Sequence, residues 1–255
     1  MVATPYTKLM TAVMDVDMAA AVLLATEERA DALGVPADQR VYLRGAGYAE
    51  EPATMAARPE PWRSPAMVAA MRSALGEMSA DEVAHFDLYS CFASSLSFGA
   101  DALALPAGCT LTVTGGLPYH GGPGSNYSTH ALAAMTEALR HDPGSAGLVS
   151  GIGMHMTSHS ASLWSTRPGA FVPAEPAGAL PTVPVAAEAS GPGRVMTFST
   201  VHSRQGPEST ALICDLPGGS RTYARLDEPA PADADLVGRT VTLSPAAKGA
   251  TAAHL

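Results

Sequence analysis

A stretch rich in proline, alanine and glycine divides the chain and limits what it can fold into. It runs from Arg167 to Arg194 and reads RPGAFVPAEPAGALPTVPVAAEASGPGR. Each proline removes a backbone hydrogen-bond donor and fixes φ, so this stretch is expected to hold neither a regular helix nor a central strand. We therefore predict an extended linker, placed at residues 169–192, between two regions of different structure.

The composition is typical of a globular protein with room for a core. The 255 residues are 47% apolar and only 15% charged, which is the reverse of a disordered chain. No run of 18 apolar residues and no signal-peptide pattern occurs, so we expect neither a membrane span nor a secretory leader. Cys91, Cys109 and Cys214 are widely spaced and odd in number, which indicates a reducing, cytoplasmic setting.

The charge distribution argues against a nucleic-acid-binding role. The net charge is −9. Basic and acidic residues balance after residue 190, so the whole excess of negative charge lies in residues 1–190. Binding to phosphates needs clustered Lys and Arg, and an acidic main body lacks them.

Before the linker, helical and strand patterns alternate, which predicts a layered α/β region. Ser64-Pro65 is a typical start of a helix, and Ser79 and Glu82 have the spacing of a capping box. The predicted helices are residues 17–33, a helix that starts after Ser64-Pro65 and includes residues 67–75, and residues 93–103 and 128–141. The predicted strands are residues 41–43, 86–89, 110–114, 147–153 and 160–165.

After the linker the pattern changes to short strands separated by turn residues. The strands are predicted at residues 195–201, 209–215, 221–226 and 237–243. A small all-β domain, barrel-like or a sandwich, is the natural interpretation.

The most unusual local sequence is TVTGGLPYHGGPGSNYSTH, residues 112–130. Its glycines allow close approach of the backbone and positive φ angles. A nucleotide site would need G-x-G-x-x-G or G-x-x-x-x-G-K-[ST], and neither occurs. Two interpretations remain: a purely structural loop, or a loop lining an acyl or carbonyl site, with polar groups from Tyr119, His120 and Asn126.

A second cluster, FDLYSCF at residues 86–92, falls where a strand turns into a helix. It lacks the G-x-S-x-G pattern of a serine hydrolase. Cys91 is either a nucleophile activated by the helix or a small buried thiol. His155 and His159 have metal-like spacing only on a helix, whereas their segment has a strand and turn pattern, so we expect no metal site.

Four stretches of the chain carry a resemblance to a known family. They are PYTKLMTAVMDVDMAAAVLLATEERADALGV, DLYSCFASSLSFGADALAL, LTVTGGLPYHGGPGSNYSTHALAAMTEALR and GLVSGIGMHMTSHSASLWSTRPG. Together they resemble the C-terminal half of the thiolase superfamily, nearest the thiolase-like relatives of the sterol-carrier-protein thiolases. The resemblance implies a layered thiolase-like half with a mixed sheet flanked by helices at residues 1–168. A small all-β, OB-like domain would follow at residues 193–255, as in some of these relatives.

The family's three C-terminal catalytic motifs are all altered in this sequence. Tyr89 stands where the family has the first residue of H-D-C-F, which helps to form an oxyanion hole. Gly122 stands at the histidine of G-H-P, which activates the nucleophile. Gly151 or Ile152 stands at the cysteine of C-x-G. A glycine can neither take nor give a proton, and the nucleophilic cysteine belongs to the N-terminal half, which this chain does not contain.

The resemblance implies an acetyl-CoA acetyltransferase-like protein of lipid metabolism, with a coenzyme A thioester as substrate and no tightly bound cofactor. A retro-aldolase and a non-catalytic half that joins a separate N-terminal half are the alternatives. The partners implied are a second copy of the chain or such a half. The expected catalytic residues are Tyr89, Tyr119 and His120, and the expected substrate-binding residues are Gly115, Gly116, Gly121, Gly122 and Asn126.

Overall fold

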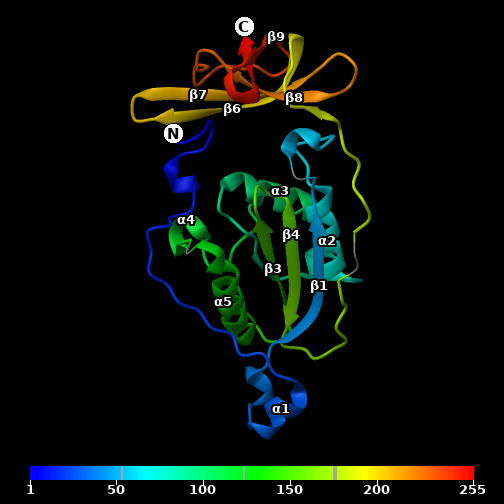
Figure 1. Cartoon of the computed structure of the whole chain (residues 1–255). Coiled ribbons are helices and arrows are strands. Elements are labelled where there is room, and N and C mark those ends of the chain that lie inside the picture. The colour runs from blue at the N-terminus through cyan, green and yellow to red at the C-terminus, as the bar shows by residue number, and fades with distance from the viewer. Residues whose placement is uncertain (53, 123, 175–176) are drawn as a thin grey trace. The chain divides into compact units, whose positions relative to one another are not determined.

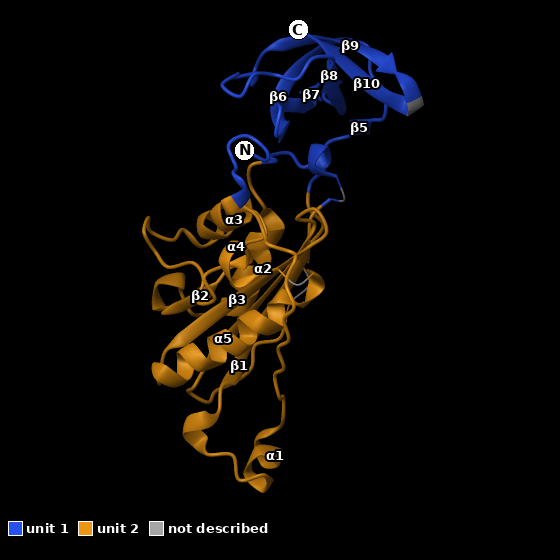
Figure 2. Cartoon of the chain, turned by 90° about the vertical axis from the view of Figure 1, so that its left-hand side faces the viewer, with its two compact units in different colours: residues 1–8, 52–61, 181–255 blue, residues 9–51, 62–180 orange. Residues whose placement is uncertain are grey.

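A computed structural model describes residues 1–52, 54–122, 124–174 and 177–255 (Figure 1). The chain forms two compact units, coloured separately in Figure 2. Residues 9–51 and 62–180 make up the α/β unit, and residues 1–8, 52–61 and 181–255 make up the β unit. Within the described ranges, no helix is long and apolar enough to cross a membrane.

The α/β unit is built on a mixed sheet with the strand order β1-β4-β3-β2. The strands are β1 (Tyr42–Glu50), β2 (His85–Asp87), β3 (Ala146–Gly153) and β4 (Ser158–Ser165). β2 and β3 run parallel, whereas the other pairs are antiparallel. The carboxyl ends of β2 and β3 therefore reach the same edge of the sheet.

Helices cover both faces of this sheet (Figure 1). Successive strand residues point to opposite faces, and the neighbours Leu148 and Val149 of β3 belong to different apolar clusters. Leu148 packs in the cluster of α2 (Pro65–Leu75) and α3 (Ala93–Leu103), and Val149 in that of α5 (Tyr127–His141). The predicted layered α/β architecture is confirmed in this unit.

Two glycines of β1 let the backbone of α2 lie directly on the sheet. A Cβ atom at Gly47 would stand 1.8 Å from the carbonyl oxygen of Ala70, and one at Gly45 would stand 2.1 Å from that of Ala74. No side chain can occupy such a position, so the glycines set the distance between helix and sheet.

Several local predictions are confirmed. Ser64 caps α2 by accepting a hydrogen bond from the backbone N–H of Met67, with Pro65 in the first turn. The predicted capping box of Ser79 and Glu82 is present and begins a short 3-10 helix, η4 (Ala80–Glu82). The helix predicted after Ser64-Pro65 corresponds to α2, and those predicted at 93–103 and 128–141 correspond to α3 and α5. Adjacent strands form near 147–153 and 160–165.

The helix predicted at residues 17–33 is wrong for most of its length. Only α1, Glu27–Ala32, is helical, and Thr26 caps it through a hydrogen bond to the backbone N–H of Arg29. Residues 18–25, MAAAVLLA, are all apolar and lack the polar face of a surface helix. They are extended instead (Figure 1).

The strand predicted at residues 110–114 is also wrong, because only one bridge, between Asp87 and Thr112, pairs this segment with β2. The backbone N–H of Thr114 donates to the side chain of Asp87 instead of to a neighbouring main chain. A side-chain acceptor thus takes the place of a strand partner.

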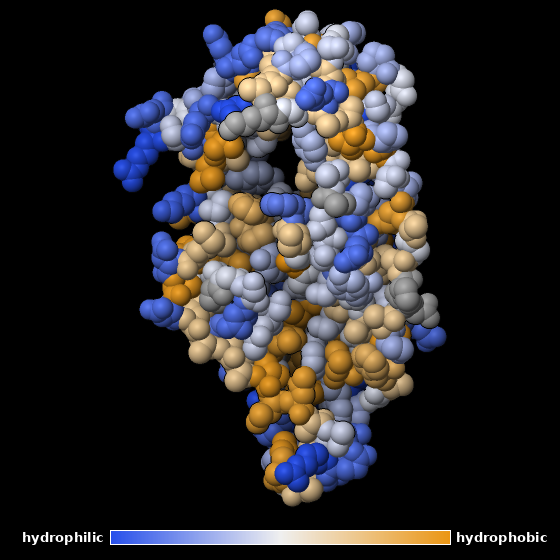
Figure 3. Space-filling view, viewed as in Figure 1, coloured by the Kyte–Doolittle hydropathy of each residue, from blue (hydrophilic) through white to orange (hydrophobic). Residues whose placement is uncertain are grey.

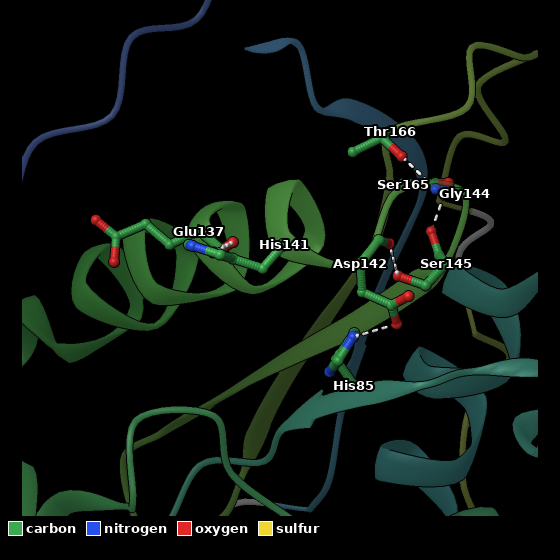
Figure 4. A network of polar contacts seen from close by, with 8 residues as sticks. All are labelled: His85, Glu137, His141, Asp142, Gly144, Ser145, Ser165 and Thr166. Carbon is green, nitrogen blue, oxygen red and sulfur yellow. Dashed lines mark hydrogen bonds and ion pairs between the residues drawn. The ribbon is translucent and has the colours of Figure 1, made fainter. Parts of the chain in front are cut away.

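The turn between α5 and β3 is held by a small polar network, drawn in Figure 4. His85 contacts Asp142 at 2.9 Å, and Ser145 Oγ donates to the carbonyl oxygen of Asp142 at 2.6 Å. Ser165 Oγ donates to the carbonyl oxygen of Ser145 at 2.7 Å. The network joins β2, β3 and β4 at the end of the sheet where β2 and β3 begin.

The β unit contains a six-stranded sheet with the order β10-β9-β6-β7-β8-β5 and an additional pairing of β10 with β8. Two strands were not predicted from the sequence: β5, which pairs parallel with β8, and β10, which pairs antiparallel with β9 and parallel with β8. The strands are β5 (Val185–Ala186), β6 (Gly191–Ser203), β7 (Gly206–Asp215), β8 (Arg221–Leu226), β9 (Thr240–Ala246) and β10 (Ala250–His254).

The prediction that residues 167–194 hold no central strand is wrong at their end. β6 begins at Gly191 and lies between β9 and β7. Pro192 is tolerated because β6 pairs only with β9 there, and its pairing with β7 starts at Arg194.

A buried arginine ties residues 52–61 to the rest of the β unit. The guanidinium of Arg221 donates to Asp215 and to the carbonyl oxygens of Ala56, Arg58 and Pro59. The remaining short helices are α4 (Leu117–His120), η1 (Lys8–Met10), η2 (Ala37–Gln39), η3 (Met55–Ala57), η4 (Ala80–Glu82), η5 (Gly124–Asn126) and η6 (Ala247–Gly249).

The close contact of β1 with α2 predicts a strong effect of a single methyl group. Gly47→Ala is expected to lower the free energy of unfolding by about 3 kcal/mol, because the helix must move off the sheet. Gly178→Ala is the matched control, since nothing lies within 4 Å of its Cβ position. Denaturant unfolding of both variants measures the difference, and equal stability of the two would contradict the packing described.

Candidate functional site

A buried carboxylate organises the edge of the sheet where β2 ends. Asp87, the last residue of β2, has an exposed fraction of 0%. Its carboxylate accepts hydrogen bonds from Thr114 N at 3.0 Å, Thr114 Oγ1 at 2.8 Å and the Tyr127 hydroxyl at 2.8 Å. This one group therefore connects β2, the glycine-rich loop and the start of α5.

Burial and hydrogen bonding shift the pKa values of both Asp87 and Tyr127. Burial raises the pKa of Asp87, and the hydrogen bonds from Thr114 and Tyr127 oppose that rise. Burial and the negative charge of Asp87 raise the pKa of Tyr127, so its phenol stays protonated and donates to the carboxylate. The pair is a fixed structural anchor and not a reactive base.

The glycine-rich loop turns sharply beside this anchor. Gly116 has a φ of 82°, a left-handed conformation that favours glycine. The backbone N–H of the next residue, Leu117, donates to Ser90 Oγ at 3.0 Å, which attaches α4 to the segment after β2. Gly121, at the end of α4, has a φ of 107° and packs against Val16 and Met18.

Aromatic and imidazole rings form a continuous row from this loop into α5. The ring centroids of Tyr89 and Tyr127 lie 5.9 Å apart, those of Tyr127 and His120 6.1 Å, and those of His120 and His130 5.6 Å. All three contacts are edge-to-face. Two of the predicted catalytic residues, Tyr89 and His120, thus both contact the ring of Tyr127.

His120 carries the feature most suggestive of chemistry. Its Nε2 atom is shielded from solvent, and no hydrogen-bond partner for it exists among the residues described by the structure. A buried polar nitrogen without a partner is unfavourable in a folded chain and therefore calls for an explanation. A bound substrate oxygen is one group that would satisfy it.

His130, on α5, contacts the ring of His120 edge-to-face. Burial and the neighbouring His120 lower the pKa of His130, so the ring is neutral near neutral pH. Its Nε2 lies 3.4 Å from the amide nitrogen of Asn126, a predicted substrate-binding residue.

The other predicted residues lie in different surroundings. Tyr119 is 77% exposed and stands outside the aromatic row. Tyr89 is half-buried, and burial raises the pKa of its phenol, which keeps it available as a donor. Burial also raises the pKa of the Cys91 thiol, although a hydrogen bond with Tyr89 opposes the rise, so Cys91 is not an activated thiolate.

The two glycines at altered motif positions are packed by their neighbours. A Cβ at Gly122 would lie 3.1 Å from Ala12 Cβ and from Leu117 Cδ2, and one at Gly151 would lie 2.7 Å from Ser160 Oγ. A histidine or cysteine at either place would require rearrangement of these side chains. Throughout the described ranges, no group of three or more His, Cys, Asp or Glu side chains could hold a metal ion.

Sequence reasoning missed three residues of the site: Asp87, Tyr127 and His130. Asp87 and Tyr127 are 40 positions apart, and no local pattern links them. The spacing of Tyr127 and His130 was a usable signal, because residues three apart share one face of a helix.

These features define the class of structure. The mixed sheet covered by helices on both faces, with a polar loop cluster at the carboxyl ends of β2 and β3, is a thiolase-like fold. The fold class is thus confirmed at this level.

The particular solved structure that it resembles is that of a monomeric SCP2-thiolase like protein type 1 from Mycobacterium smegmatis. The TM-score is 0.84 at 29% sequence identity, and the match covers 100% of this chain but 59% of that one. The chain therefore spans about three fifths of the length of this neighbour. No protein-family model matches the sequence, and no curated protein matches it.

The Asp87 anchor predicts different roles for two tyrosines. Tyr127→Phe should lower the free energy of unfolding by about 1–3 kcal/mol, because a buried carboxylate oxygen loses a donor. Tyr119→Phe removes the same atom from a mostly exposed side chain and should leave stability unchanged. Thermal and denaturant unfolding compare the two, and a neutral Tyr127→Phe would show that the hydrogen bond to Asp87 is dispensable.

Proposed function

We propose that this chain acts on acyl-CoA thioesters as part of a thiolase-like acyltransferase of the acetyl-CoA acetyltransferase type. The observation that carries the proposal is the Nε2 of His120, which has no hydrogen-bond partner among the described residues and whose ring contacts Tyr127, the same ring that Tyr89 contacts, within a thiolase-like fold. Such a site could receive the carbonyl oxygen of a thioester, with Gly115, Gly116, Gly121, Gly122 and Asn126 lining the approach. Coenzyme A enters as part of the substrate.

Acyl transfer requires a nucleophile that this chain does not provide in reactive form. The thiol of Cys91 has a raised pKa and remains protonated, and Gly122 brings no base to activate one. The nucleophilic cysteine would therefore have to come from residues outside this sequence, as the resemblance to a C-terminal half implies.

This incompleteness predicts the outcome of a simple assay. With acetoacetyl-CoA and coenzyme A, the isolated chain should give no thiolysis above the uncatalysed rate, because the site lacks an activated cysteine. Loss of the thioester enolate absorbance measures the reaction. Rapid thiolysis by the pure chain would refute the requirement for an external nucleophile.

Carbon–carbon bond cleavage of aldol type is the second candidate, favoured by the unpartnered imidazole nitrogen. In a β-hydroxyacyl-CoA, Nε2 of His120 would remove the hydroxyl proton and the bond between the α and β carbons would break. The β carbon leaves as an aldehyde or ketone, and the remaining electron pair forms a thioester enolate. Donation from the Tyr89 hydroxyl would stabilise that enolate, and a returned proton gives the shorter acyl-CoA.

Substitutions of the proposed catalytic residues test this aldol-type cleavage. If it occurs, Tyr89→Phe should lower kcat/KM about 10²–10³-fold by removing the enolate donor, and His120→Gln about 10²–10⁴-fold by removing the base. Tyr48→Phe, which removes a hydroxyl bonded to Glu50 on β1, is the control. Release of carbonyl product from a β-hydroxyacyl-CoA is measured, and unchanged turnover in Tyr89→Phe would end the proposed role of that residue. Tyr119→Phe decides whether the second tyrosine takes part.

Assembly with a separately supplied N-terminal half is the non-catalytic alternative, and association of two copies of this chain is a further one. The fraction of the neighbour's length that this chain spans, 59%, supports the first of these.

For the β unit we propose an OB-like barrel, because the pairings connect β6-β7-β8-β10-β9 and return to β6.

A further inference from the structure

Three polar side chains of the β unit form a Ser–His–Asp arrangement outside the site described above. The Oγ atom of Ser244 lies 2.9 Å from Nε2 of His254, and Nδ1 of the same ring contacts the carboxylate of Asp227. One nitrogen of the imidazole thus meets a hydroxyl group and the other meets a carboxylate. A nucleophilic serine requires this order of contacts, and not merely the three residue types.

Adjacent strands of one sheet supply the three residues. Ser244 belongs to β9, His254 belongs to β10, and Asp227 directly follows β8. β10 pairs with both of the other strands, and the backbone N–H of Asp227 donates to the carbonyl oxygen of Ala253 at 3.2 Å. Figure 2 shows β8, β9 and β10 together in the β unit. Main-chain pairing therefore holds the arrangement, which is a more precise support than a loop.

The register of β9 and β10 explains why Ser244 and His254 meet. Leu243 and Ala253 are opposite each other, and both are buried in the apolar core of the β unit. Side chains alternate along a strand, so Ser244 and His254, each one position further along, point away from that core. Because the strands are antiparallel, these two residues are diagonal neighbours, and a long side chain spans that separation.

The register of β8 and β10 places the carboxylate on the same face. These strands are parallel, and Ala253 is opposite Leu226, so Asp227 and His254 are the next residues on each strand. Leu226 is buried in the core as well. Asp227 therefore points outward beside His254, in agreement with the contact between their side chains.

The carboxylate determines which nitrogen of His254 is basic. A carboxylate only accepts hydrogen bonds, so Nδ1 of the neutral ring holds the hydrogen atom and donates it to Asp227. Nε2 is then the basic nitrogen, and it faces the hydroxyl group of Ser244. The ring can therefore accept the proton of Ser244 when the serine oxygen attacks a substrate, which is the role of a general base.

The arrangement is accessible to a substrate. Ser244 is half-buried, and the side chains of His254 and Asp227 are 45% and 52% exposed. Ala252, directly opposite Ser244, adds only a methyl group to the surface beside it. Polar and apolar residues are mixed in the upper part of Figure 3, where the C-terminus lies (compare Figure 1). Such a surface offers contacts both to the acyl chain and to the carboxyl group of an ester.

We propose that Ser244, His254 and Asp227 form a second active site, which hydrolyses carboxylic esters. Ser244 Oγ bonds to the ester carbonyl carbon while its proton moves to Nε2 of His254. The bond to the alkoxide then breaks, the alkoxide takes that proton and leaves as the alcohol, and an acyl-serine remains. Water attacks the acyl group with His254 again as the base, which releases the carboxylic acid and restores Ser244. This activity is independent of the thiolase-like site and of its substrate.

Labelling of the full chain with a fluorophosphonate, a reagent for nucleophilic serines, tests the site. The serine oxygen bonds to phosphorus and fluoride leaves, so mass spectrometry of the digested protein should find the phosphonyl group on Ser244. His254→Gln should slow the labelling about 10²-fold by removing the base, and Asp227→Asn at least about tenfold by removing the acceptor that orients it. An unlabelled Ser244 in the unsubstituted chain would overturn the proposal, and this result does not depend on how any variant folds.

Hydrolysis of 4-nitrophenyl acetate by the full chain measures turnover. Ser244→Ala should lower kcat/KM at least about tenfold, and the initial burst of 4-nitrophenolate that marks an acyl-serine should disappear. The substitution removes one oxygen atom outside the apolar core, and circular dichroism checks that the fold is unchanged. Unchanged turnover in Ser244→Ala would overturn the proposal, because an exposed imidazole alone would then be the catalyst.

A second hydroxyl–imidazole pair in the β unit provides the matched control. Thr4 Oγ1 lies 2.7 Å from Nε2 of His202, but among the described residues no carboxylate contacts that ring. Thr4→Val and His202→Gln should therefore leave the labelling of Ser244 and the ester turnover unchanged. Equal losses in His202→Gln and His254→Gln would overturn the assignment, because the assays would then report a general change of the β unit.

Discussion

The α/β unit depends on the buried carboxylate of Asp87. Three donors from two distant segments converge on it, and each replaces a hydrogen bond that water provides in the unfolded chain. Because the group is fully buried, the loop and α5 must both be in place for it to be satisfied. The positions of Tyr89, His120 and His130 follow from that requirement, since they belong to the segments that the carboxylate holds together.

The resulting site contains hydrogen-bond donors and the neutral imidazole of His130. The thiol of Cys91 beside it is not activated. Burial keeps the phenols of Tyr89 and Tyr127 and the thiol of Cys91 protonated. Such groups polarise a carbonyl and move protons, and they do not form an acyl-enzyme. The described site therefore has groups that can polarise a carbonyl and move a proton, and it lacks an activated thiol.

Predictions from the sequence succeeded where a local signal was sufficient. Ser64-Pro65 marked the start of α2, and the spacing of apolar residues identified α5. They failed for residues 17–26, because a run of apolar residues does not distinguish a helix from a strand without knowledge of what surrounds it. Of the proposed site, Tyr89 and His120 were identified, whereas Asp87, Tyr127 and His130 were not.

The sequence by itself determined where most helices and strands lie and which catalytic groups are lacking, because caps, prolines and the identity of a residue act within a few positions. Gly122 cannot transfer a proton in any fold. Only the tertiary structure decided which polar groups meet, since the contact of Asp87 with Tyr127 spans 40 positions and depends on how the loop closes. It also decided that residues 17–25 are extended, because their one buried face exists only where Gly121 and its neighbours provide a surface for it.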